Sequence, residues 1–261
     1  MIDTHCHLTS KGLCHRVDQV VQSARDAGVD HMICIGTDPD DARLALSFAR
    51  KFGMVSCTVG LQPHDAHKWT DRVELVDAIT EIASQPQVVA LGEMGLDKYY
   101  ADPPLADQQR VFEWQLQMAA ECVGRISELP IVIHNRQATD LVIELIKSVG
   151  LPGSRFVFHC FTGTAEELDK ILAFGAMVSF TGVITFKNSD ALAAASDKVP
   201  LDRLMVETDS PYLTPEPHRK IKPNEPRFVV EVAGFIARRR DLSFEVMEKI
   251  LDDNARRFFH L

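Results

Sequence analysis

The hydrophobic positions along the chain fall into two alternating kinds of segment. Short apolar runs, rich in β-branched and aromatic residues, have the length and composition of strands that are buried on both faces. These runs cover residues 1–3, 31–36, 54–60, 88–92, 130–133, 155–158, 176–180 and 204–207. Between them, apolar residues recur with helical spacing, which predicts amphipathic helices. The predicted helices cover residues 17–27, 40–52, 72–84, 105–122, 139–149, 164–174, 190–196, 227–238 and 244–259.

The alternation of eight predicted strands with helices indicates an α/β fold in one domain, residues 1–261. A closed (β/α)8 TIM barrel fits this order and this length, and a doubly wound open sheet is the main alternative. The sequence has no internal repeat, no low-complexity stretch and no linker between two compositions. The proline-rich stretch 211–226 is predicted to be a long loop, because a helical pattern resumes directly after it.

The composition is that of an ordinary globular protein, with 46% apolar residues. No apolar run approaches the roughly 20 residues that span a bilayer, and the polar first residues do not resemble a signal peptide. We therefore expect a cytoplasmic enzyme without membrane contact.

None of the six cysteines belongs to a C-x-x-C pair. Cys34 and Cys57 lie in apolar runs, and Cys6 and Cys160 are predicted to point into the core.

The net charge of −9 argues against a general electrostatic attraction to nucleic acid, since proteins that bind polyanions in this way are basic. Any contact with nucleic acid must therefore be local and partly mediated by metal. The basic cluster 218–222, in the predicted long loop, is a candidate track for phosphates.

Six candidate metal ligands lie at the carboxyl ends of the predicted strands, where barrel enzymes build their active sites. His5 and His7 are two positions apart on an extended segment, so their side chains share a face. Imidazole and carboxylate together suit Zn²⁺, Mn²⁺ or Mg²⁺. The six residues are His5, His7, Glu93, His134, His159 and Asp209.

Six ligands exceed the three or four of a single catalytic zinc site, so we predict two divalent ions that share a bridging carboxylate. Glu93 is the predicted bridge. His5, His7 and Asp209 would complete the shell of one ion, and His134 with His159 that of the other. Asp209 is also the predicted general base, because it can orient a metal-activated water and take up its proton. Mg²⁺ is the expected working ion, with Zn²⁺ or Mn²⁺ as alternatives.

Three further residues are candidates for substrate binding. His64 follows the third predicted strand and could donate a hydrogen bond to phosphate. Arg136 could bind phosphate or pair with Asp140 at helical spacing. Lys187, after the seventh strand, is a similar case. Three aromatic residues after other strands could stack on bases or simply wall a pocket: Tyr99, Tyr100 and Phe161.

Four motifs resemble the signatures of the TatD family of metal-dependent deoxyribonucleases, within the amidohydrolase superfamily. They are DTHCHL at residues 3–8, GEMGLD at 92–97, FHCFTG at 158–163 and ETDSPYL at 207–213. The resemblance implies a TIM barrel, divalent cations and 3′→5′ trimming of single-stranded or damaged DNA. It also implies the same six ligands, and a place for His64 beside the substrate phosphate.

The chain departs from the pattern of this family at two positions. Gln62 stands where the family usually carries a histidine, and Pro223 stands where an arginine usually precedes Asn-Glu-Pro. Both bear on substrate contacts rather than on the predicted metal shell.

From the ligands and the family resemblance together, we predict a monomeric DNA exonuclease, with two alternatives. One is a metal-dependent esterase or amidase such as a D-aminoacyl-tRNA deacylase, and the other is a non-catalytic binding protein with a vestigial site.

Overall fold

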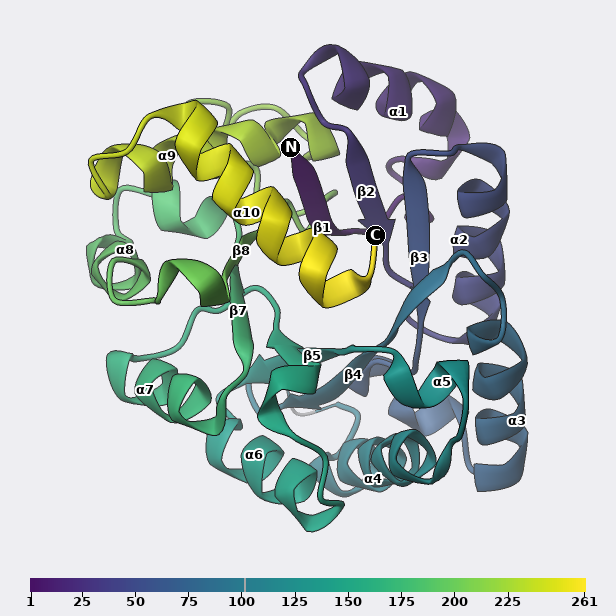
Figure 1. The fold of residues 1–261 in the computed structure, drawn as a ribbon. Coiled ribbons are helices and arrows are strands. Elements are labelled where there is room, and N and C mark those ends of the chain that lie inside the picture. The colour runs from purple at the N-terminus through teal and green to yellow at the C-terminus, as the bar shows by residue number, and fades with distance from the viewer. Residues whose placement is uncertain (101) are drawn as a thin grey trace.

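Eight parallel strands form one sheet in which each strand pairs with the next along the chain (Figure 1). The computed structural model describes residues 1–100 and 102–261. The strands are β1 Ile2–Cys6, β2 His31–Cys34, β3 Val55–Val59, β4 Val88–Asp97, β5 Ile131–Arg136, β6 Phe156–Phe158, β7 Met177–Phe180 and β8 Leu204–Val206. Their order from β1 to β8 contains no reversal, which a doubly wound sheet would require.

The sheet closes between β1 and the segment that follows β8. Cys6 and Ser210 form a parallel bridge. The backbone N–H of Asp209 donates to the carbonyl of His5 at 2.9 Å, and that of His7 donates to the carbonyl of Ser210 at 2.7 Å. The predicted barrel is thus confirmed, and the same hydrogen bonds tie Asp209 to β1 beside two other candidate ligands.

Helices surround the barrel and connect its strands (Figure 1). They are α1 Val17–Asp26, α2 Pro39–Lys51, α3 Arg72–Ala83, α4 Leu105–Glu121, α5 Arg125–Glu128, α6 Thr139–Ser148, α7 Ala165–Phe174, α8 Asp190–Ser196, α9 Val229–Arg239 and α10 Phe244–Phe259. Among the described residues, no helix combines the length and the apolar character needed to cross a membrane.

Three strands are longer than their apolar runs predicted, because polar residues continue them. β1 extends through His5, β5 extends through His134, and all ten residues of β4 are buried. Close packing of β4 against β5 requires Gly95, since a Cβ atom there would lie 2.0 Å from the carbonyl oxygen of His134. The polar ends of these strands therefore belong to the barrel wall and bring their side chains close together.

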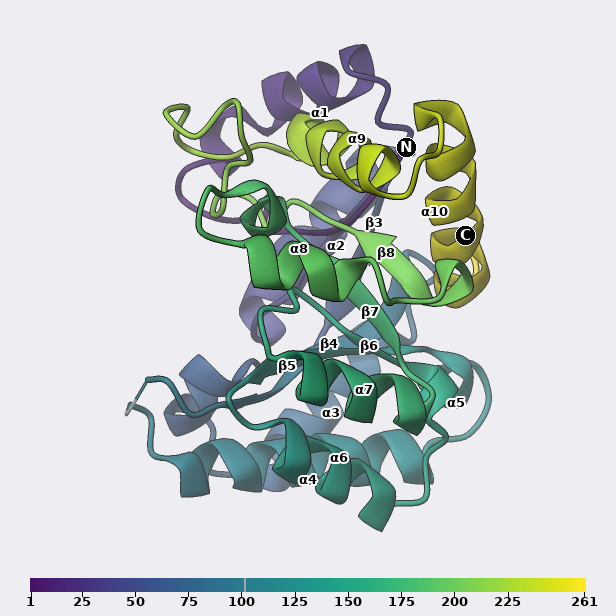
Figure 2. The ribbon, with the colours of Figure 1, turned by 90° about the vertical axis from the view of Figure 1, so that its left-hand side faces the viewer.

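Apolar side chains fill the end of the barrel where the strands begin, and α10 covers it (Figures 1 and 2). Phe258 and Phe259 of α10 pack there with residues from the strands. The strand residues in this cluster include Ile2, Ile33, Val89, Val132, Val157, Met177 and Met205. This end is therefore sealed, and the polar residues gather at the other end.

Candidate metal centre

All six candidate ligands come together at the end of the barrel where the strands finish. Three groups of three drawn from these six have ligand atoms within 4.8 Å of one another, and a fourth such group joins His134 with His64 and Asp97. One wall of a cavity of about 1130 Å³ is formed by five of them, namely His7, Glu93, His134, His159 and Asp209. The sixth, His5, is fully buried behind this wall.

The first half of the centre contains His5, His7 and Asp209. The Nε2 atoms of His5 and His7 lie 3.3 Å apart. Oδ1 of Asp209 lies 3.2 Å from Nε2 of His7 and 3.6 Å from Nε2 of His5. Ligands bound tetrahedrally to one Zn²⁺ at about 2.1 Å stand roughly 3.4 Å from one another. The spacing and the chemistry of these donors therefore fit one divalent ion.

The second half contains His134 and His159, and Glu93 joins the two halves. Oε1 of Glu93 lies 2.7 Å from Nδ1 of His134 and 3.0 Å from Nε2 of His159. Oε2 of the same carboxylate lies 3.6 Å from Nε2 of His5. Each oxygen of Glu93 thus faces a different half, which is the arrangement that a bridging carboxylate needs.

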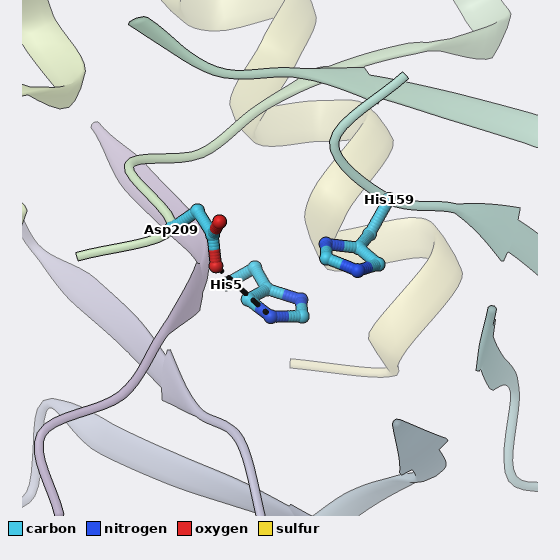
Figure 3. Close-up of side chains that lie close together, drawn as sticks. All are labelled: His5, His159 and Asp209. Atoms are coloured by element: carbon cyan, nitrogen blue, oxygen red, sulfur yellow. Dashed lines mark ion pairs between the residues drawn. The ribbon is translucent and has the colours of Figure 1, made fainter. Parts of the chain in front are cut away.

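The imidazoles of His5 and His159 connect the two halves directly. Their rings are stacked at 3.9 Å between centroids, with an angle of 6° between their planes (Figure 3). Asp209 approaches from the segment after β8 and points its carboxylate at His5. The stack fixes the spacing between ligands of the two halves, because buried flat rings in contact have little freedom to turn.

Asp209 has a left-handed backbone conformation. Its φ of 51° lies in a region that aspartate adopts more readily than most residues with a side chain. The buried carboxylate of Asp3 accepts hydrogen bonds from the amide and the hydroxyl of the preceding Thr208, at 2.9 and 2.6 Å. The side chain of Asn224 donates to the carbonyl of Thr208 at 3.0 Å. These contacts position Asp209 for the centre.

Two buried carboxylates that sequence reasoning did not select orient the histidines of the second half. Oδ2 of Asp97 accepts from Nε2 of His134 at 3.1 Å, and Oε1 of Glu207 accepts from Nδ1 of His159 at 3.2 Å. A carboxylate behind a ligating histidine fixes its ring and its tautomer. Asp97 lies four positions after Glu93 on β4, so the alternation of side chains along a strand places both on one face. This spacing is the sequence signal that could have identified Asp97.

The electrostatics of the centre affect its ligands differently. Burial lowers the pKa of every histidine ligand, but facing carboxylates more than offset this and raise the pKa of His7, His134 and His159 above its usual value. Burial opposes the charge of Glu93, but His159 and the hydrogen bonds from both second-half histidines hold its pKa well below the usual range. Burial, together with the neighbouring His159, lowers the pKa of His5. Glu93 is therefore anionic and His5 neutral. Nδ1 of His5 is buried without a hydrogen-bond partner among the described residues.

The candidate substrate residues are distributed unevenly around the cavity. His64 and Arg136 line it, and Nε2 of His64 donates to Oδ2 of Asp97 at 3.0 Å. Lys187 lies outside its lining. The alternative pairing of Arg136 with Asp140 is wrong, because both carboxylate oxygens of Asp140 accept from Lys170 instead, at 2.7 and 2.9 Å.

The aromatic and cysteine predictions were partly correct. Tyr99 and Tyr100 line the cavity with exposed rings, whereas Phe161 is buried and offers no stacking surface. Cys6 is buried as predicted, but Cys160 lines the cavity. The φ of 46° at Cys160 breaks the strand alternation from which a core position was inferred.

The two departures and the basic cluster also have defined places. Gln62 lines the cavity and donates to Asp65 at 2.8 Å, whereas Pro223 is not among the lining residues. In the cluster 218–222, His218 pairs with Glu231 at 3.0 Å, and Arg219 lies over the ring of Phe186. No member of the cluster lines the cavity.

Comparison with known proteins gives matches over the whole chain. Residues 2–260 match the protein family described as "TatD related DNase". A Bacillus subtilis protein named "Uncharacterized metal-dependent hydrolase YabD" is 34% identical, and the match covers 100% of this chain and 99% of that protein. A Musicola paradisiaca protein named "3'-5' ssDNA/RNA exonuclease TatD" is 37% identical, with 100% and 98% covered.

Solved structures agree with these matches. The structure of YJJV, a TatD homologue from Escherichia coli, has a TM-score of 0.91 at 25% identity and covers 100% of this chain and 98% of its own. A TatD family hydrolase from Entamoeba histolytica has a TM-score of 0.88 at 21% identity, over 99% and 97% of the two chains. The second likeness supports the fold alone.

Proposed function

Because the chain belongs to the family of TatD-related DNases and is a metal-dependent hydrolase, we propose that it removes nucleotides from the 3′ end of single-stranded DNA. The observation that carries this proposal is the position of Glu93, whose two oxygens face separate groups of histidines. Such a centre suits phosphodiester hydrolysis, in which attacking and leaving oxygens both need stabilisation. A single chain supplies all six ligands, so we propose that a monomer is sufficient.

We propose that His5, His7, Glu93 and Asp209 hold one ion, and that Glu93, His134 and His159 hold the other. Mg²⁺ is the proposed working ion, and the imidazole-rich shell also suits Mn²⁺ or Zn²⁺. Bound ions of this kind polarise the phosphate and lower the pKa of an attacking water.

Asp209 is the proposed general base, because it is the carboxylate of the centre that solvent can reach. Its side chain is 14% exposed, against 3% for Glu93. In this role Asp209 takes the proton of the attacking water at its carboxylate while the neighbouring histidines fix its orientation. We propose that His64, which lines the cavity and whose Nε2 lies 3.0 Å from Oδ2 of Asp97, stands beside the substrate phosphate.

The test is a product ladder from single-stranded DNA labelled at its 5′ end. The expected result is progressive shortening with Mg²⁺ or Mn²⁺ and none in excess chelator. Parallel reactions with RNA of the same sequence and with a D-aminoacyl-tRNA compare kcat/KM at equal enzyme concentration. Cleavage that persists in chelator would refute the metal mechanism, and faster hydrolysis of the aminoacyl ester than of DNA would refute the proposed substrate.

A further inference from the structure

One wall of the cavity presents two exposed tyrosines beside the metal centre. Tyr99 is 56% exposed and Tyr100 is 51% exposed, although both line the cavity. Their backbone amides donate to Oδ1 of Asp97, at 2.8 and 3.1 Å. The other oxygen of that carboxylate holds His134 and His64. The tyrosines are therefore fixed to the same support as the candidate ligand.

Arg136 lies against these rings. Its guanidinium is 3.8 Å from the ring centre of Tyr99 and 5.2 Å from that of Tyr100. Within residues 1–100 and 102–261, no carboxylate forms a salt bridge with Arg136. The carboxylate nearest to it in sequence, that of Asp140, is paired with Lys170. A guanidinium that stacks over an aromatic ring can still use its N–H groups to bind an anion such as phosphate.

The rings form a continuous series from the cavity rim to the centre. Tyr99 and Tyr100 meet edge to face at 5.0 Å, and Tyr100 meets His64 at 5.6 Å. His64 in turn meets His134 at 5.2 Å. A group bound on the tyrosines would therefore be a neighbour of a group bound at the centre.

The opposite side of the cavity offers less for stacking, because among the described residues Tyr212 is the one exposed aromatic side chain there. The lining residues near β1 and β2 are small or acidic: Thr9, Ser10, Thr37 and Asp41. Tyr212 also lines the cavity but stands beside His7, at 6.2 Å between ring centroids, in the first half of the centre. Aromatic surface and an unpaired cation coincide only on the Tyr99 wall of the described cavity.

We propose that Tyr99, Tyr100 and Arg136 form a nucleotide subsite. The base next to the scissile bond stacks on an exposed tyrosine, and the guanidinium binds the flanking phosphate. This inference rests on the proposed function and specifies how the substrate is held. Because every base has a π face, stacking of this kind tolerates any sequence. It gives an acidic protein a local means of binding a polyanion.

The test crosses two alanine variants, each with a matched phenylalanine variant, with three substrates. One oligonucleotide carries all its bases, and in others the terminal or the penultimate nucleotide is abasic. Loss of the stacked base is expected to lower kcat/KM of the wild type about 5- to 150-fold. Tyr99→Ala or Tyr100→Ala should lower kcat/KM by a similar factor on the complete substrate and much less on the abasic one. The matched Tyr→Phe variants keep the ring, so the difference in kcat/KM between the complete and the abasic substrates should remain as in the wild type.

A binding measurement without cleavage separates this inference from the proposed function. Anisotropy of a labelled oligothymidylate with metal-free protein should show weaker binding for Tyr99→Ala. For Arg136→Ala, the logarithm of the association constant plotted against the logarithm of the salt concentration should also have a slope that is less negative by about 0.7. This is the value for one phosphate contact with a single strand. Equal affinity of wild type, Tyr99→Ala and Tyr100→Ala would overturn the subsite even in an active nuclease. If instead Tyr212→Ala removes the difference in kcat/KM between the complete and the abasic substrates, the base stacks on the opposite side of the cavity. This result would also overturn the subsite.

Discussion

The two ends of the barrel are built from the same eight strands, yet they bury different atoms. Where the strands begin, aliphatic side chains pack against Phe258 and Phe259 of α10. Where they finish, the buried groups are imidazoles and carboxylates, including His5, Glu93 and His159. In barrels of this kind the first end stabilises the fold and the second carries the chemistry.

The difference shows how the fold accommodates so many buried ionisable groups. A buried charge is costly unless it is paired and hydrogen-bonded. At the polar end the pairing is supplied by residues such as Asp97 and Glu207, which contact histidines rather than solvent. At the apolar end packing alone suffices. Substitutions at the two ends should therefore affect different properties of the protein.

The largest effect is expected for a charge removed at the polar end. Asp209→Asn should lower kcat/KM on DNA about 10²- to 10⁴-fold, because it removes the proposed base and the negative charge that faces the proposed ion. Asp202→Asn makes the same chemical change just before β8, at the apolar end, where Asp202 is exposed. Steady-state kinetics should find this control unchanged, and similar losses in both variants would remove the distinction between the ends.

A truncation at the apolar end should do the opposite. Phe259→Ala removes a ring that is 1% exposed and should lower the free energy of unfolding by about 3–5 kcal/mol. Denaturant titration measures this loss, and the remaining folded protein should keep its kcat/KM. Val123→Ala, at a side chain that is 86% exposed, should change the stability by less than about 0.5 kcal/mol. A large fall in kcat/KM for Phe259→Ala would contradict the expectation that the apolar end affects stability and not catalysis.

The support behind the second half of the centre should have a smaller effect. Glu207→Gln weakens the acceptor for Nδ1 of His159 and should lower metal affinity about 10- to 100-fold. Calorimetric titration with Mn²⁺ would measure it. Glu166→Gln, the same change on the exposed surface of α7, is the matched control. If both variants bind Mn²⁺ as the wild type does, Glu207 does not support a metal ligand.

The pH dependence of stability tests the apolar end again. Burial, with a contribution from Arg256, lowers the pKa of His31 to about 4. The unfolded chain protonates this histidine near pH 6.5, so the stability that it contributes is lost as the pH falls from about 6.5 to 4. The loss should be at most about 3 kcal/mol, and His31→Gln should remove it. Parallel stability curves for both proteins between these pH values would contradict the assignment.

Much of this architecture could be predicted from sequence because hydrophobic periodicity and strand-end position are local signals. The eight strands and the convergence of the six candidate ligands both followed from them. Strand ends were underestimated where polar residues such as Glu93 and His134 stay in the barrel wall. Asp97 was missed because its partners, His64 and His134, come from other elements and contact it only in the folded chain.

The number of divalent ions bound per chain, measured together with the rate of DNA hydrolysis, distinguishes a two-ion centre from a single-ion centre. Two ions per wild-type chain are predicted, with full activity only when both are bound. Glu93→Gln should bind neither tightly, because its carboxylate faces both halves. Full activity with a single bound ion, or unchanged binding of two ions by Glu93→Gln, would refute a two-ion centre bridged by Glu93.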